Sequence, residues 1–145
     1  MAGFTDAVEQ EILDWFIATR TPTTKYIALS TTTPTEAGGN FTEPSTGAYA
    51  RVSTVAADWG AASGTAPAVK SNTAVKTFPT ATANWSAGAN MTHFGIYDAA
   101  TAGNLLCWGV LGTPTPNPKP VLSGDPASFP AGSLVLKLGD PTDTY

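Results

Sequence analysis

The sequence predicts a mostly β fold: an antiparallel β-sandwich or small barrel with one N-terminal amphipathic helix and long loops rich in Pro, Gly and Thr. Three observations lead to this prediction. Apolar residues recur at helical spacing only near the N-terminus. From residue 25 onward, short runs alternate between apolar and polar residues, as strands do. Clusters of Gly, Asn, Asp and Pro separate these runs and are typical of turns.

The helix is expected over about residues 4–18. Its apolar stripe is formed by Phe4, Val8, Leu13, Trp15 and Phe16, and Ile12 widens it. Thr5 is the expected N-cap, and the helix must end before Pro22, because proline disfavours a helical residue before it. A stripe this rich in aromatic side chains avoids water. We therefore expect the helix to cover a sheet of its own chain or to dock on another subunit.

Six strands are expected, at residues 25–30, 49–55, 73–78, 92–98, 105–111 and 133–138. The run 105–111 is almost entirely apolar, which indicates a strand buried on both faces. The strands define a β core over about residues 25–138, followed by a short tail at 139–145. A chain of 145 residues has the usual length of one domain, so we expect a single domain spanning 1–145.

The composition excludes several classes of protein. Charged residues make up 12% of the chain, against about 25% in a typical domain, so the surface is neutral, polar and easily desolvated against a neighbour. The net charge is −4 and the basic residues are scattered, which argues against nucleic-acid binding. No apolar run approaches the roughly 20 residues needed to cross a bilayer, and the N-terminus lacks signal-peptide features. The single cysteine suits folding in a reducing cytoplasm.

Residues that carry catalysis or bind metals are few and scattered. The one histidine, His93, lies within an expected strand and is expected to be a polar residue on a half-exposed face. Cys107 lies in an apolar run where a thiol has a raised pKa and little reactivity. Asp140 and Asp143 near the C-terminus lack the glycine and glutamate of a calcium loop. The remaining carboxylates considered are Glu36, Glu43, Asp58 and Asp98, none in a recognisable catalytic setting. We expect no catalytic, cofactor or metal site, and no enzymatic activity.

Several residues are candidates for contacts with a partner protein. Trp59 and Trp85 are expected in the core or at a subunit interface, although exposed indoles would instead suit stacking on a sugar. The segment 113–120 carries proline at alternate positions and favours a stiff, extended arm. The long connection 31–48 is a further candidate for contacts. The residues predicted to contact a partner are Phe4, Val8, Trp15, Trp59, Trp85, Pro114, Pro116 and Pro118.

Several segments together resemble a known family. They are residues 29–35, 42–44, 47–52, 78–82 with Trp85, 92–106, 123–125 and 128–132. The most specific of them is His93-Phe-Gly-Ile-Tyr-Asp-Ala-Ala100. The set resembles a family of small virion proteins of tailed bacteriophages, commonly labelled minor capsid, head decoration or cement proteins, and often loosely labelled tail fibre proteins. The family pattern contains no catalytic residues.

The resemblance implies a virion structural protein made in the host cytoplasm. The expected role is a decoration subunit that binds the outer surface of the major capsid protein lattice, stabilises the shell by packing, and forms a homo-oligomer, with a trimer as our guess. Two alternatives remain open. One is a tail-associated or tail-fibre module that binds a receptor through exposed Trp59 or Trp85. The other is a cell-wall hydrolase.

Overall fold

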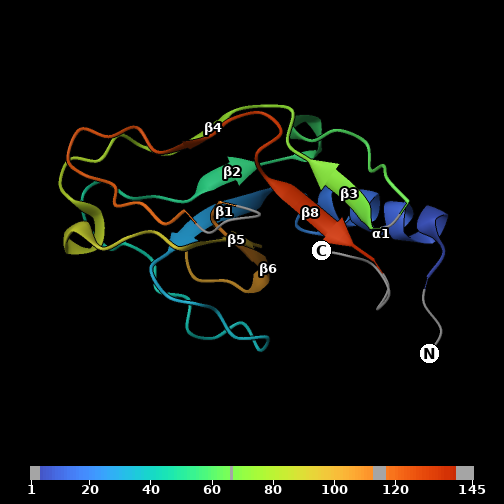
Figure 1. The fold of residues 1–145 in the computed structure, drawn as a ribbon, viewed down its shortest axis with the longest axis horizontal. Helices are drawn as coiled ribbons and strands as arrows, with labels where there is room; N and C mark the ends of the chain where they lie inside the picture. The colour runs from blue at the N-terminus through green and yellow to red at the C-terminus, as the bar shows by residue number, and fades with distance from the viewer. Residues whose placement is uncertain (1–3, 66, 113–116, 140–145) are drawn as a thin grey trace. The chain divides into compact units, whose positions relative to one another are not determined.

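The computed structural model describes residues 4–65, 67–112 and 117–139 (Figure 1). By their internal contacts, the residues divide into two compact units. The first unit comprises Met1–Thr23, Val55–Lys76 and Phe129–Tyr145, and the second comprises Thr24–Thr54 and Thr77–Ser128. The expectation that the whole chain folds as one domain stays a prediction.

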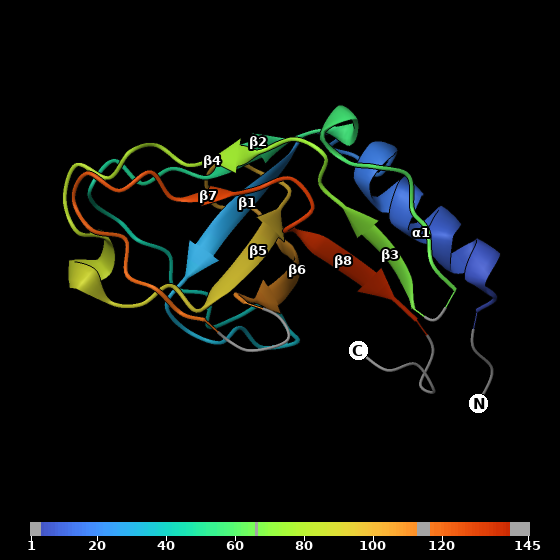
Figure 2. The same ribbon diagram turned by 45° about the horizontal axis from the view of Figure 1, so that its top comes forward.

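The first unit packs one helix against a two-stranded sheet. Helix α1 (Asp6–Ala18) lies alongside the antiparallel strands β3 (Ala68–Ser71) and β8 (Val135–Leu138) in Figures 1 and 2. Leu13 and Ile17 of the helix are buried. Their burial removes two large apolar side chains from water, which stabilises the unit by about 1.5–3 kcal/mol for each.

The helix begins two residues later than expected. Thr5 is the extended N-cap residue, but its side chain makes no capping hydrogen bond. Polar contacts fasten α1 to its own unit: the Asp14 carboxylate accepts hydrogen bonds from the Lys70 ammonium at 2.7 Å and from the Ala62 amide at 2.9 Å. Of the two placements considered for the helix, the structure shows the one on a sheet of its own chain.

Strand β8 confirms the expected alternation, whereas β3 was not predicted. Leu134 and Leu136 are buried, and Val135 between them is exposed, as a two-residue period requires. The sequence of β3 is Ala-Val-Lys-Ser, and the side chain at its second buried position is Lys70. A lysine on the buried face breaks the apolar pattern, so the hydropathy of this segment gives no strand signal. Its ion pair with Asp14 makes that burial tolerable.

The second unit is built on a four-stranded antiparallel sheet. The strand order is β2 (Val52–Thr54), β1 (Lys25–Ser30), β5 (His93–Tyr97) and β6 (Leu105–Val110). Figure 2 shows β1, β5 and β6 side by side. In the register of β1 and β5, Ile27 lies opposite Ile96 and Leu29 lies opposite Phe94. These four side chains are buried on one face of the sheet and form its apolar layer.

Three predicted strands are shorter than expected or differently placed. The range 49–55 contains only β2, and 73–78 contains only β4 (Lys76–Thr77), which pairs with the unpredicted β7 (Ser128–Phe129). The range 105–111 is strand β6, but it is not buried on both faces. It lies at the edge of its sheet, and its residues are half-buried or exposed. Apolar content alone does not distinguish a central strand from an apolar edge strand.

The fold class is confirmed as mostly β with one N-terminal helix and antiparallel sheets. In the described part of the chain no sheet closes into a barrel. Nor does any described helix have the length and apolar character needed to cross a membrane.

Candidate functional site

The face of α1 that points away from β3 and β8 carries large apolar side chains in water. Phe4 is 63% exposed, Val8 37% and Trp15 52%. Because a helix turns 100° per residue, Val8 and Trp15 lie on one side of α1, roughly opposite Leu13 and Ile17, whereas Phe4 precedes the N-cap residue Thr5 just before the helix begins. We call Phe4, Val8 and Trp15 the outer helix stripe.

The charges around the stripe are acidic. Glu11 is exposed and lies one helical turn before Trp15, on the border of the stripe. The last turn of the helix contains no basic residue. Asp14 is engaged elsewhere, because its hydrogen bond with the Lys70 ammonium holds the pKa of its carboxyl below the usual value. The stripe is therefore a rigid apolar surface with an acidic border.

Trp59 and Trp85, expected either in the core or at a partner surface, lie in the core. The exposed fraction is 6% for Trp59 and 0% for Trp85. The Trp85 indole N–H donates to the Gly47 carbonyl at 2.8 Å, and its ring packs edge-on against Tyr49 at 5.0 Å. Stacking on a sugar requires an exposed indole face, which neither residue offers in this structure.

The proline-rich segment is described only in part. Pro118 is exposed, and the neighbouring Lys119 forms an antiparallel bridge with Met91. Pro114 and Pro116 lie outside the described residues. The prediction that this segment contacts a partner stays a prediction.

The second unit contains a polar cluster that the sequence reasoning missed. The Arg51 guanidinium pairs with the Glu43 carboxylate through Nε, at 3.1 Å to Oε1 and 3.0 Å to Oε2, and through Nη2. Its Nη1 donates to the carbonyls of Ala99 at 2.8 Å and Ala102 at 2.7 Å. Its Cζ lies 3.5 Å from the centre of the Tyr97 ring. We call Glu43, Arg51, Tyr97 and the adjoining Tyr49 the arginine cluster.

The arginine cluster joins two loops to the sheet. The Tyr49 hydroxyl donates to Glu43 at 2.8 Å and accepts from the Leu29 amide of β1 at 3.0 Å. Burial and the nearby Glu43 charge raise the pKa of Tyr49 well above its usual value of 10, so this hydroxyl keeps its proton. The loop before β2 and the hairpin 98–104 are thus fixed to the same guanidinium. Every group in the cluster has a partner within the chain, which indicates a structural role.

Three of the four carboxylates considered for catalysis have structural partners. Asp58 pairs with the Lys76 ammonium and accepts from the Val55 amide, and Asp98 accepts from the amide and the side chain of Asn104. Glu43 belongs to the arginine cluster, and Glu36 is exposed. Among the described residues, no group of three or more His, Cys, Asp or Glu could hold a metal ion.

The remaining reactive side chains are the half-buried Cys107 and the buried His93. Burial raises the pKa of the Cys107 thiol to about 12, as expected for a thiol in apolar surroundings. His93 is not on a half-exposed face as expected but is buried in β5, because β5 is a central strand covered on both faces. Its Nδ1 lies 2.8 Å from the Thr92 hydroxyl and its ring 5.6 Å from that of Trp108. Burial lowers its pKa, so the ring is neutral at physiological pH. The two groups lie on opposite faces of the sheet and form no nucleophile–base pair.

These features define a small β-rich protein whose polar clusters hold loops in place and whose helix α1 exposes apolar side chains. A family model described as "Podophage GP4 fiber I protein gp80" matches residues 3–137. The chain belongs to this family, which is one of phage virion structural proteins. The predicted resemblance is thereby confirmed in part: the chain belongs to a family of phage virion structural proteins. The family description names a fibre protein rather than a capsid decoration protein. No curated protein matches the chain.

Proposed function

We propose that this protein is a non-enzymatic structural subunit of a phage fibre, and that it attaches to another virion protein through the outer helix stripe. The observation that carries the proposal is the exposure of Val8 and Trp15 on a helix whose opposite face is already packed, together with the exposed Phe4 just before that helix begins. The family description, which names a fibre protein, supports the fibre over the capsid as its location.

The stripe is suited to rigid attachment. Burial of each large apolar side chain contributes about 1.5–3 kcal/mol, and tryptophan is among the residues most enriched at the energetic centres of interfaces. Because α1 is held by Leu13, Ile17 and the Asp14–Lys70 pair, little backbone order has to be gained on docking. The acidic border formed by Glu11 favours a partner surface with basic residues around an apolar centre.

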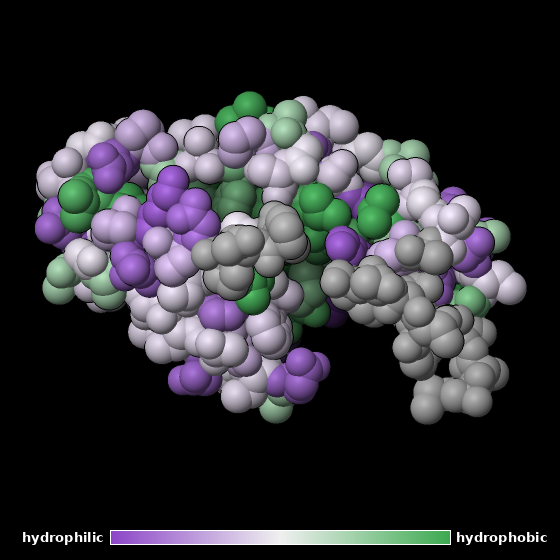
Figure 3. Space-filling view, in the orientation of Figure 1, coloured by the Kyte–Doolittle hydropathy of each residue, from purple (hydrophilic) through white to green (hydrophobic). Residues whose placement is uncertain are grey.

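The rest of the surface supports a role in packing. Figure 3 shows a face dominated by residues of intermediate hydropathy, with few strongly hydrophilic ones. This agrees with a chain of which only 12% of residues are charged. Few ions must lose water when such a surface meets a neighbour.

A decoration subunit on the outer surface of the major capsid protein is the second candidate. The low charge content and the net charge of −4 also suit an exterior position away from packaged DNA. The glycan-binding alternative loses its support because Trp59 and Trp85 are buried. The hydrolase alternative loses support because Glu43, Asp58 and Asp98 are bound within the fold, which leaves the exposed Glu36 as the remaining carboxylate of the four considered.

The location is tested by quantitative mass spectrometry of purified particles after heads and tails are separated. The proposal expects this chain in the tail fraction at a small copy number set by the fibres. Hundreds of copies in the head fraction would instead establish the decoration role.

The surface is tested with a matched pair of variants. Val8→Asp places a charge in the stripe, at a first-turn position where the helix dipole favours an acid. Val75→Asp makes the same change at another exposed valine of the same unit, 59% exposed. We expect Val8→Asp to reduce incorporation into particles by at least about tenfold, equivalent to about 1.4 kcal/mol, and Val75→Asp to leave it unchanged. Equal incorporation of the two variants would contradict the role of the stripe.

A further inference from the structure

Strand β6 leaves the four-stranded sheet of the second unit with an open apolar edge. In the described part of the chain its only neighbouring strand is β5. Its sequence, Leu-Leu-Cys-Trp-Gly-Val, contains no charged residue and no proline. Proteins commonly protect exposed edge strands with lysine or proline, because unpaired backbone groups recruit further strands. The residues of β6 itself, Leu105–Val110, carry neither.

The unpaired backbone groups can be assigned from the register. β6 pairs with β5 so that Phe94 lies opposite Gly109 and Gly95 lies opposite Trp108, and the Leu111 amide donates to the Thr92 carbonyl at 2.9 Å. In an antiparallel ladder, successive residues direct their N–H and C=O groups alternately to the two sides. Leu111 and Gly109 therefore face β5, whereas Trp108 and Val110 direct their backbone groups to the open side.

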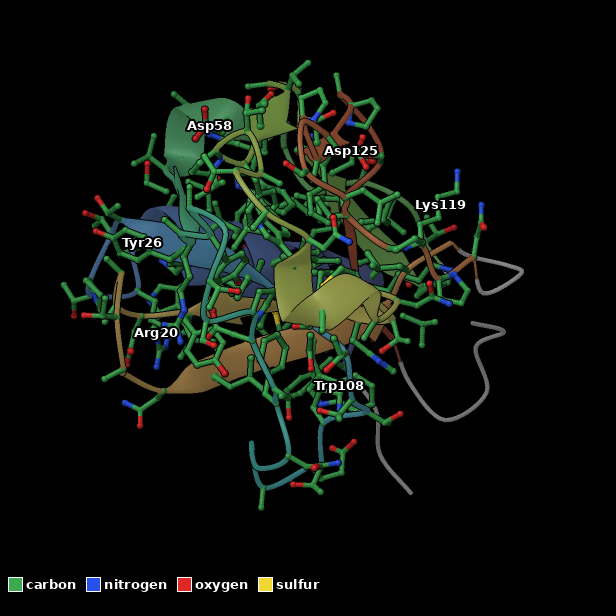
Figure 4. The ribbon with its side chains drawn as sticks, turned by 90° about the vertical axis from the view of Figure 1, so that its left-hand side faces the viewer. Arg20, Tyr26, Asp58, Trp108, Lys119 and Asp125 are labelled. Carbon is green, nitrogen blue, oxygen red and sulfur yellow. The ribbon has the colours of Figure 1, made fainter. Side chains whose placement is uncertain are left out.

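The side chains at this edge are apolar and accessible. Val110 is 40% exposed, and Trp108, labelled in Figure 4, is half-buried beside His93. On the other face Gly109 lies beneath the Phe94 ring, and a Cβ atom at this glycine would come within 2.7 Å of that ring. Gly109 therefore leaves the middle of the edge free of a bulky side chain.

We propose that β6 is a self-association edge, which pairs antiparallel with β6 of a second copy of this chain. With Gly109 of both copies on the twofold axis, Trp108 of each copy lies opposite Val110 of the other. The outward backbone groups then form about four hydrogen bonds. Both aromatic–β-branched pairs lie on the same face of the joined sheet, an arrangement that stabilises antiparallel strands.

The self-complementary register points to a second copy as the occupant, and the charges at the edge permit it. Two chains of net charge −4 repel each other overall, but at β6 they can meet without placing like charges opposite each other. Residues 105–112 contain no charged side chain, and the antiparallel register opposes only apolar residues and glycine. The outer helix stripe, by contrast, carries Glu11 on its border and would oppose like charges if it paired with itself.

The test uses the full chain and a matched pair of substitutions. Val110→Lys adds the edge lysine that β6 lacks, and Val135→Lys makes the same change at a valine of β8 that is also 40% exposed. Sedimentation equilibrium over a range of concentrations measures the dimer dissociation constant of each variant. Amide hydrogen exchange at Trp108 and Val110 reports whether the open edge is hydrogen-bonded.

We expect the unmodified chain to dimerise, with the Trp108 and Val110 amides protected as the dimer forms. Val110→Lys should raise the dissociation constant at least about tenfold, equivalent to about 1.4 kcal/mol, and remove this protection. Val135→Lys should change neither. A chain that stays monomeric at about 100 μM, or a dimer unaffected by Val110→Lys, would overturn the proposal.

The proposal would also be overturned if the Trp108 and Val110 amides became protected only when a different virion protein was added, because β6 would then bind that protein instead of a second copy. Val8→Asp should leave dimerisation unchanged, which separates this proposal from the one for the helix stripe.

Discussion

Replacing Arg51 with alanine tests whether the arginine cluster holds the second unit together. The side chain is 7% exposed, and that of its partner Glu43 is 22% exposed. The substitution removes the ion pair, two hydrogen bonds to loop carbonyls and the contact with the Tyr97 ring. It also leaves a partly buried carboxylate without its cation.

The expected loss is about 3–5 kcal/mol, the range measured when one partner of a buried ion pair is removed. A domain of this size is stable by only about 5–15 kcal/mol, so the loss is a large fraction of the total. Urea unfolding followed by tryptophan fluorescence measures the free energy of unfolding by linear extrapolation. The double variant Arg51→Ala/Glu43→Gln should be more stable than the sum of the single effects by at least about 1 kcal/mol, because it removes the unpaired carboxylate.

Lys119→Ala serves as the control, since it deletes an exposed cation from the same unit and should change stability by no more than about 0.5 kcal/mol. If Arg51→Ala lies within about 1 kcal/mol of the unmodified protein, or if the double variant is additive, the cluster does not have the energetic role assigned to it.

Two further predictions concern buried titratable groups. Because its pKa is about 12, the Cys107 thiol should react with iodoacetamide at pH 8 far more slowly in the folded protein than in urea, and equal rates would contradict its burial. For His93, the folded pKa lies below the unfolded value of 6.5, so the unfolded chain takes up the proton first. The free energy of unfolding should therefore fall as the pH drops below 6.5, and His93→Gln should flatten this decline between pH 7 and 5. An unchanged slope in the variant would show that other groups control the pH dependence.

The helix shows what a local sequence pattern can and cannot predict. The spacing of apolar residues predicted α1 and its approximate ends, because helical periodicity is a local property. The pattern placed Leu13 and Trp15 on one apolar stripe, yet Leu13 is buried and Trp15 is 52% exposed. A helix that is apolar around much of its circumference has no unique inner face. The position of the strands it packs against selects one.

The arginine cluster, in contrast to the helix, could not be predicted from local sequence. Glu43, Arg51 and Tyr97 come from three separate segments, and Glu43 was visible in the sequence only as one of several unassigned carboxylates. Nothing in the local sequence indicates that a guanidinium will lie over a tyrosine ring 46 residues away along the chain. Such contacts exist only once the sheet has brought the loops together.

By itself, the sequence determined the mostly β class, the N-terminal helix and the alternating faces of β8, because each follows from composition or short-range periodicity. Only the tertiary structure decided that Trp59 and Trp85 lie in the core, that Phe4, Val8 and Trp15 face water, and that β6 is an edge strand. The physical reason is that burial and strand order depend on which distant segments pair. That pairing is determined by long-range packing, which cannot be predicted from any one short segment of the sequence.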